Sequence, residues 1–148
     1  MRLSTKAQYA VRAMVDLALY SDGRPISLRE IASREEIPLT YLEQLFFRLK
    51  RENLVRSVRG PGGGYLLAKN GADITVGEIV AGVEESLDPV DCEDREGGAC
   101  SRIPLCATYS VWKGLGEKIR SFLDSIRLAD LASEARHRID RPISGKTN

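Results

Sequence analysis

The stretch from residue 26 to residue 68 most constrains the fold, because it sets two short helices and two strands in close succession. Ser27 and Glu30 have the spacing of a capping box, which predicts a helix beginning at Leu28. Pro38 disfavours helical geometry in the residue before it and so ends this helix. A second capping box, at residues 40–43, predicts another helix within a turn. Two short helices joined this tightly form a helix-turn-helix, here at about residues 28–51.

Two strands are predicted directly after it, at about residues 54–68, with the glycine-rich tip Gly60-Pro61-Gly62-Gly63-Gly64 between them. This tip lacks the Gly-Lys-Ser/Thr ending of a phosphate-binding loop, and no helix follows it. Residues without side chains suit a hairpin that approaches a DNA backbone closely. The predicted fold class is therefore mainly α with a small β-hairpin wing, a winged helix-turn-helix.

Further helices are predicted on both sides of this unit. Residues 5–20 have apolar side chains at helical spacing and begin with Thr5 and Gln8 as a capping box. Residues 74–79 contain another capping box, which predicts a short helix. Near the end of the chain, apolar residues step by three and four, the a/d spacing of helices that pair: Trp112, Leu115, Ile119, Phe122 and Ile126. This stripe predicts a dimer seam, although packing on its own domain stays open as an alternative.

The charge of the chain is unevenly distributed. Residues 1–70 contain twelve lysines and arginines against seven acids, a balance of +5, whereas residues 71–148 contain ten against fourteen, a balance of −4. The basic half therefore suits a polyanionic partner. No apolar run approaches the roughly 20 residues that span a bilayer, and residues 1–6 lack the apolar core of a signal peptide. These features predict a cytoplasmic protein with no membrane partner.

The second helix of a helix-turn-helix enters the major groove with its N-terminal residues facing base edges. Four side chains are placed to read double-stranded DNA in this way: Thr40, Tyr41, Glu43 and Gln44. Three cations further along are predicted to hold phosphates: Arg48, Lys50 and Arg51. Arg59, beside Gly60 at the wing tip, is predicted to enter a minor groove.

All three cysteines, Cys92, Cys100 and Cys106, fall within fifteen residues of a glycine-rich, acidic segment. Cysteines buried as small hydrophobic residues lie in apolar patterns, unlike this polar segment. Structural zinc usually has four ligands with closely spaced cysteine pairs, and this chain has no such pair. An iron–sulfur cluster is therefore the favoured interpretation, and a metal-free thiol redox switch is the alternative. An enzyme with a small-molecule substrate lacks support, because His137 is far from the other candidate residues and no nucleophile–base pair stands out.

The chain resembles the iron–sulfur regulators of the IscR, NsrR and RirA type. Four features carry this resemblance: residues 1–3 with 9–11, residues 41–46, the wing at residues 57–65, and the cysteines. The resemblance covers nearly the whole chain. It implies a homodimeric winged-helix regulator whose long C-terminal helices pair and whose cysteines bind a cluster that tunes affinity for an operator of two half-sites. Repression is the expected mode, with activation left open. It also implies DNA contacts from Tyr41, Glu43, Gln44, Ser57 and Arg59.

Relatives of the IscR type typically have a histidine ligand where this chain has Tyr109. The fourth ligand therefore stays open, with Glu84, Glu85, Asp88 and Asp91 as candidates, and so does the choice between a [2Fe-2S] and a [4Fe-4S] cluster. We expect three parts: a winged helix-turn-helix DNA-binding domain at 1–83, a cluster-binding loop and dimerisation helix at 84–132, and a flexible tail at 133–148. The predicted signal is cluster supply, iron, oxygen or nitric oxide.

Overall fold

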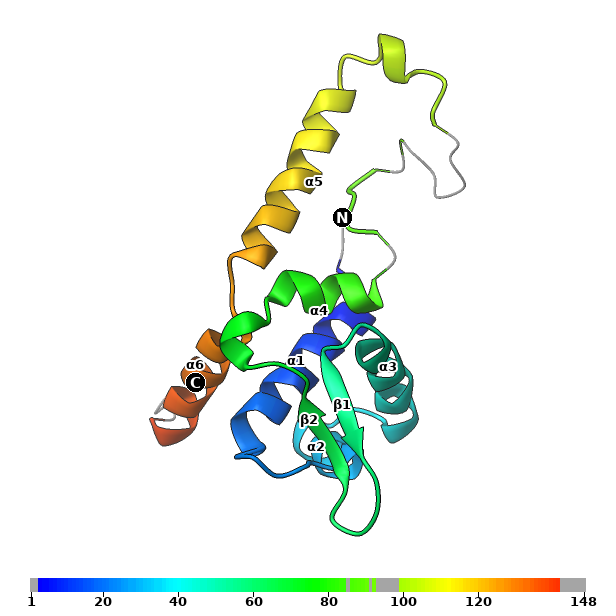
Figure 1. The fold of residues 1–148 in the computed structure, drawn as a ribbon. Helices are drawn as coiled ribbons and strands as arrows, with labels where there is room; N and C mark the ends of the chain where they lie inside the picture. The colour runs from blue at the N-terminus through cyan, green and yellow to red at the C-terminus, as the bar shows by residue number, and fades with distance from the viewer. Residues whose placement is uncertain (1–2, 85, 91, 93–98, 142–148) are drawn as a thin grey trace, which may run out of the picture.

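The computed structural model describes residues 3–84, 86–90, 92 and 99–141 and consists of a helical body, a projecting arm and a returning helix (Figure 1). The body contains helices and a hairpin in the order α1 (Thr5–Tyr20), α2 (Leu28–Glu35), α3 (Leu39–Arg51), β1 (Val55–Val58), β2 (Gly64–Leu67), η1 (Gly71–Asp73) and α4 (Val76–Val83). The arm and the returning helix follow as η2 (Ile103–Leu105), α5 (Tyr109–Asp124) and α6 (Leu128–Asp140). The predicted fold class, mainly α with a small hairpin wing, is confirmed.

Helix α1 has the predicted bounds but a different cap. Ser4 is the N-cap residue, and its hydroxyl accepts a hydrogen bond from the backbone amide of Ala7. The predicted box between Thr5 and Gln8 is therefore wrong, and the Gln8 side chain donates to the carbonyl of Leu3 instead. A serine one residue earlier offers the same capping oxygen, so the helix gains its cap one position upstream.

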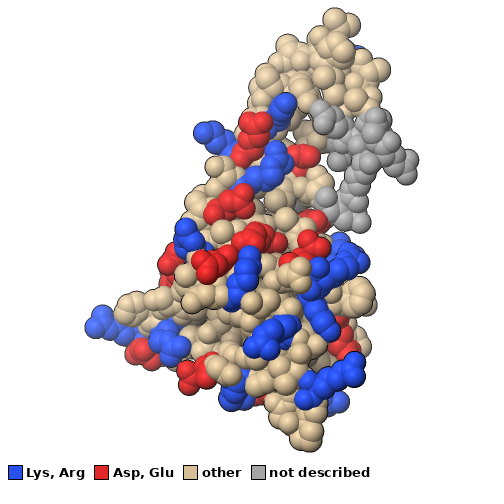
Figure 2. Space-filling model, in the orientation of Figure 1, with Lys and Arg blue, Asp and Glu red and all other residues tan. Residues whose placement is uncertain are grey.

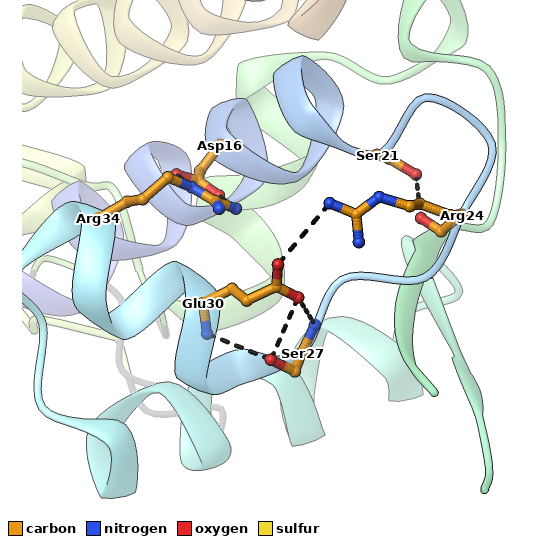
Figure 3. Close-up of polar contacts among 6 residues, drawn as sticks. All are labelled: Asp16, Ser21, Arg24, Ser27, Glu30 and Arg34. Carbon is orange, nitrogen blue, oxygen red and sulfur yellow. Dashed lines mark hydrogen bonds and ion pairs between the residues drawn. The ribbon is translucent and has the colours of Figure 1, made fainter. Parts of the chain in front are cut away.

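The helix-turn-helix contains one predicted capping box and lacks the other. Ser27 and Glu30 bond each other's backbone amides at the start of α2 (Figure 3). At α3, however, the N-cap residue is Pro38, whose carbonyl accepts from the amides of Tyr41 and Leu42. Thr40 therefore lies inside the helix, and the box predicted for it is wrong. The fixed φ of proline, −56° here, leads the chain into the helix before Thr40 can act as a cap.

A buried ion pair joins α2 to α1. The side chain of Asp16 is fully buried, and both of its oxygens accept from the guanidinium of Arg34, at 2.7 and 3.0 Å (Figure 3). The same guanidinium lies 4.1 Å from the centre of the Tyr20 ring. A bidentate pair of this kind fixes orientation as well as distance, so it sets the angle at which α2 crosses α1.

The wing is bonded to the body at its base. Strands β1 and β2 pair antiparallel, and Tyr65 of β2 also exchanges two backbone hydrogen bonds with Ile26, at 2.8 and 3.0 Å. A Cβ on Gly64 would lie 2.3 Å from the carbonyl oxygen of Ile26, and Gly64 has a φ of 153°, so this close approach requires glycine. The Tyr65 ring packs 5.0 Å from that of Phe46. The wing therefore keeps a fixed position relative to α3.

The C-terminal part differs from the prediction. Helix α5 ends at Asp124, so Ile126 lies beyond it and packs against the core. A backbone clip follows, in which Val76 donates to Ile126 and Leu128 donates to Ile74, both at 2.8 Å. Helix α6 then packs beside α1 (Figure 1).

The flexible tail predicted from residue 133 is therefore wrong as far as Asp140, because residues 133–140 continue α6. Arg136 of this helix donates to the carbonyl of Leu19. His137, which was expected in the tail, is an exposed residue of α6. Residues 142–148 lie outside the described residues. The error arose because α6 is predominantly polar and is held by packing near its start, where Leu128 is fully buried.

We expect Asp16→Asn to lower the free energy of unfolding by about 2 kcal/mol. Removing one partner of a buried pair typically costs about 3–5 kcal/mol, and the partial exposure of Arg34, 29%, reduces this because water can still solvate its charge. Urea unfolding followed by circular dichroism measures the change. Asp140→Asn, on the exposed surface of α6, is the matched control and should change stability by less than about 0.5 kcal/mol. Equal effects of the two substitutions would contradict the role given to Asp16.

Candidate DNA-binding face and cysteine loop

Helix α3 has two distinct faces. Its apolar residues Leu42, Leu45, Phe46 and Leu49 are buried in the core. The opposite face exposes Thr40, Glu43 and Gln44, three of the four residues predicted to read bases. Because side chains three and four residues apart share one face of a helix, burial of the apolar set forces these polar groups outwards. The helix therefore presents hydrogen-bonding side chains near its N-terminus.

The predicted phosphate contacts divide into two groups. Lys50 and Arg51 are exposed, and Lys50 donates to the hydroxyl of Ser57 on β1 at 2.9 Å. This bond places a cation between α3 and the wing. Arg48, in contrast, donates to the backbone carbonyl of Val83 at 3.1 Å, so the guanidinium contacts the end of α4.

Tyr41 is half-buried, although it was predicted to face DNA. Its ring lies 5.5 Å from that of Tyr9 in an edge-to-face contact, and burial raises the pKa of its hydroxyl. Tyr41 therefore joins α3 to α1 as well as bordering the exposed face.

Arg59 and Gly60 are exposed at the wing tip. The tip itself forms a tight turn, in which the backbone amide of Gly63 donates to the carbonyl of Gly60 at 2.9 Å. Figure 2 shows that lysines and arginines predominate in the lower part of the body, around the helix-turn-helix and wing, and that acids gather nearer α4 and α5. This distribution agrees with the charge balance of the two halves.

Sequence reasoning missed one exposed side chain on the face of α3 and another on the wing. Phe47 is 65% exposed on α3, one turn after Glu43, and Arg56 is exposed on β1. The helical spacing from Gln44 to Phe47 and the strand alternation from Val55 to Arg56 were the signals that could have identified them.

The backbone links the three cysteines at the outer end of α5. The amide of Cys100 donates to the carbonyl of Cys92 at 2.7 Å. The turn at Ile103–Leu105 follows, and Cys106 then leads into α5 through a bond from the Tyr109 amide to its carbonyl. Cys100 is exposed and the other two are half-buried, and no disulfide joins any of the three.

The thiol of Cys106 has the chemistry of a ligand. Its sulfur lies 3.2 Å from the hydroxyl of Thr108, and this hydrogen bond lowers the pKa of the Cys106 thiol. Thiolates are the form that binds soft metals and iron–sulfur clusters. Within the described residues no three ligating side chains lie close enough together to hold a metal ion, so the fit rests on donor chemistry and on the backbone links between the cysteines.

The candidates for a fourth ligand have different surroundings. Asp88 pairs with Arg120 of α5 at 2.8 Å, and Glu84 accepts a hydrogen bond from Ser4. Glu85 and Asp91 lie outside the described residues. Tyr109 lines a hollow beside the loop together with Asp88, Val90, Cys92, Trp112, Lys113 and Arg120.

The predicted dimer seam is partly exposed. On α5, Trp112 and Leu115 are each 38% exposed and Phe122 is 64% exposed, while Ile119 is half-buried. Ile126 is partly buried and packs against the core instead. The arm thus carries an apolar stripe that the described part of this chain covers only in part.

None of the helices among the described residues is long and apolar enough to cross a membrane.

Comparison with known proteins gives consistent matches along the chain. Residues 3–134 match the Rrf2 family model, described as an iron-dependent transcriptional regulator. The chain is 49% identical to the HTH-type transcriptional regulator IscR of Yersinia enterocolitica and 48% identical to that of Serratia proteamaculans. Each match spans 133 residues, 90% of this chain and 80% of the relative.

Two solved structures share the fold. One is T. potens IscR, with a TM-score of 0.76 and 38% identity over 98% of this chain and 94% of that one. The other is CymR, the global cysteine regulator of B. subtilis, with a TM-score of 0.72 and 33% identity over 90% and 98%. The resemblance inferred from the motifs is confirmed: the chain belongs to the Rrf2 family of transcriptional regulators.

Proposed function

We propose that this regulator is a homodimeric repressor whose affinity for its operator depends on an iron–sulfur cluster held by Cys92, Cys100 and Cys106. The observation that most supports this proposal is the position of the cysteine loop, the segment between α4 and α5 that contains the three cysteines. It starts at the end of α4, which bonds to α3, and it ends at the start of α5, which carries the exposed apolar stripe. A ligand of this loop thus acts between the DNA-binding face and the dimer arm.

The contacts at the start of the loop support this coupling. Arg48 of α3 donates to the carbonyl of Val83, and Ser4 at the cap of α1 donates to Glu84. Tension or release in the loop therefore acts on the last turn of α4 and, through one hydrogen bond, on α3. Two states of the loop would bias the position of α3 in two ways, which is the requirement for a switch.

The thiolates would supply three of the ligands, and Glu84 and Asp88, which lie between α4 and Cys92, are the described candidates of this chain for the fourth. When bound, the cluster supplies iron that reacts with oxygen or nitric oxide and that reports iron and cluster supply. The choice between [2Fe-2S] and [4Fe-4S] depends on the fourth ligand.

The dimer would pair the α5 helices of two chains. Pairing would cover Trp112, Leu115 and Phe122, whose exposure is costly in water. A two-fold axis along the arm would place two copies of α3 on two half-sites, about 34 Å or a multiple apart.

A second candidate is a metal-free thiol switch. The lowered pKa of the Cys106 thiol and the exposure of Cys100 favour oxidation at neutral pH. Anaerobic purification separates the two candidates, because a brown protein that contains iron and sulfide supports the cluster, whereas a colourless protein without iron supports the thiol switch.

We expect the triple substitution Cys92→Ala, Cys100→Ala and Cys106→Ala to abolish the difference in operator affinity between cluster-loaded and stripped protein. A coupling of this kind typically changes affinity about 5- to 150-fold. Fluorescence anisotropy with operator DNA measures it under anaerobic conditions, and sedimentation shows whether the dimer persists. Identical affinities of the loaded, stripped and triple-variant proteins on every operator tested would exclude cluster sensing.

We expect Arg48→Met to reduce the ratio of affinities between loaded and stripped protein by about 2- to 30-fold, because mutations along a coupling route change the coupling free energy by about 0.5–2 kcal/mol. The methionine keeps the apolar stem and removes the donor to Val83. Lys50→Met is the matched control, since Lys50 bonds the wing and not α4. Equal ratios for the two variants would show that Arg48 does not transmit the signal.

We expect Arg51→Ala to make the salt dependence of DNA binding shallower by about 0.9 per bound chain in a plot of log affinity against log salt concentration, because one phosphate contact is lost. Titrations between about 50 and 200 mM salt measure this slope. Arg138→Ala removes an exposed arginine of α6 and should leave it unchanged. An unchanged slope for Arg51→Ala would remove this residue from the interface.

A further inference from the structure

Phe47 has an unusual place on the exposed face of α3. Its side chain is 65% exposed, whereas its neighbour Phe46 is completely buried. The rest of this face is polar or charged. When a partner covers a large apolar side chain that is exposed to water in this way, the free energy of the complex is lowered.

The neighbours of Phe47 indicate what that partner is. Glu43 and Gln44 precede it by four and three residues and Arg51 follows by four, so all four side chains share one face. Together with Arg48 they line a shallow groove on the helix surface. The guanidinium of Arg51 lies 5.9 Å from the centre of the Phe47 ring.

This face has an apolar centre with hydrogen-bonding groups on one side and cations at its edge, where Arg51 and the exposed Lys50 lie. The major groove has the complementary arrangement, with base edges inside and phosphates along both rims. Among the four bases, thymine alone presents a methyl group there. Acidic side chains of a protein partner would match the cations but not the polar groups that flank Phe47.

We propose that Phe47 contacts the C5-methyl group of a thymine and thereby determines part of the operator sequence. The proposal rests on the proposed function only in requiring that α3 enters the major groove of DNA. It does not require a cluster.

Replacing thymine by uracil removes this methyl group and leaves every hydrogen-bonding group of the base in place, so it isolates the contact. The full-length protein, prepared anaerobically, first selects its operator from random duplexes. Each thymine of the selected half-site is then replaced by uracil in turn. Affinities are measured for the wild type, Phe47→Ala, Phe47→Leu and the control Ile139→Ala, which alters an exposed apolar residue of α6.

The wild type and Ile139→Ala should lose about fourfold in affinity at one thymine of each half-site, the value expected for burying one methyl group. Phe47→Ala should bind the thymine and uracil operators equally, and Phe47→Leu should keep part of the preference. Thermal unfolding confirms that the variants remain folded.

The same thymine preference in the wild type and Phe47→Ala, or no preference at any position, overturns the proposal while leaving DNA binding intact. Failure to select any operator overturns both the proposal and the DNA-binding function. If Phe47→Ala lowers the affinities for the thymine and uracil operators by the same factor, the wild-type preference for thymine persists. The side chain then supports affinity without reading the base, and the proposal is again wrong.

Discussion

Packing against α1 is the constraint on which the rest of the structure depends. Helices α2, α3, α4 and α6 and strand β2 all contact this helix. Ala7, Ala10 and Ala13 are completely buried, and their small side chains let neighbouring backbones approach closely. At the other end of α1, Asp16 holds Arg34 and so fixes α2. The position of the DNA-binding face therefore follows from one buried helix, and a shift of α1 would act on each of these five elements.

The second important junction is at the end of α4, where elements of different purpose meet. The carbonyl of Val83 accepts from Arg48 of α3, and Glu84 accepts from Ser4 at the cap of α1. Eight residues further along is Cys92. Arg48 therefore helps to position α3 against α4. Its charge did not suggest this role, because an arginine in a basic helix was interpreted as a phosphate contact. Coupling through the proposed sensor depends on backbone carbonyls that this helix end leaves available.

Much of the fold could be predicted, because local signals and burial agree over residues 26–68. The box at Ser27 and Glu30 and the glycine tip each act within a few residues. The errors have local causes of another kind. Ser4 competes with Thr5 as a cap, Pro38 starts α3 before Thr40, and α6 has too weak an apolar pattern to distinguish it from a tail. Of the site, the outward face of α3 was predictable from periodicity, whereas the half-burial of Tyr41 against Tyr9 required the packing of two helices.

The sequence by itself determined the winged helix-turn-helix, the polar residues on the exposed face of α3 and the clustering of three cysteines, because each depends on spacing along the chain. Only the tertiary structure decided what lies beside these features. It directed Arg48 to the end of α4, brought Lys50 to Ser57 of the wing and left Phe47 exposed between Glu43 and Arg51. It also separated α5 from α6 by a backbone clip between residues 74–76 and 126–128. These contacts join residues far apart in the chain, and their existence depends on how the helices pack rather than on any local pattern.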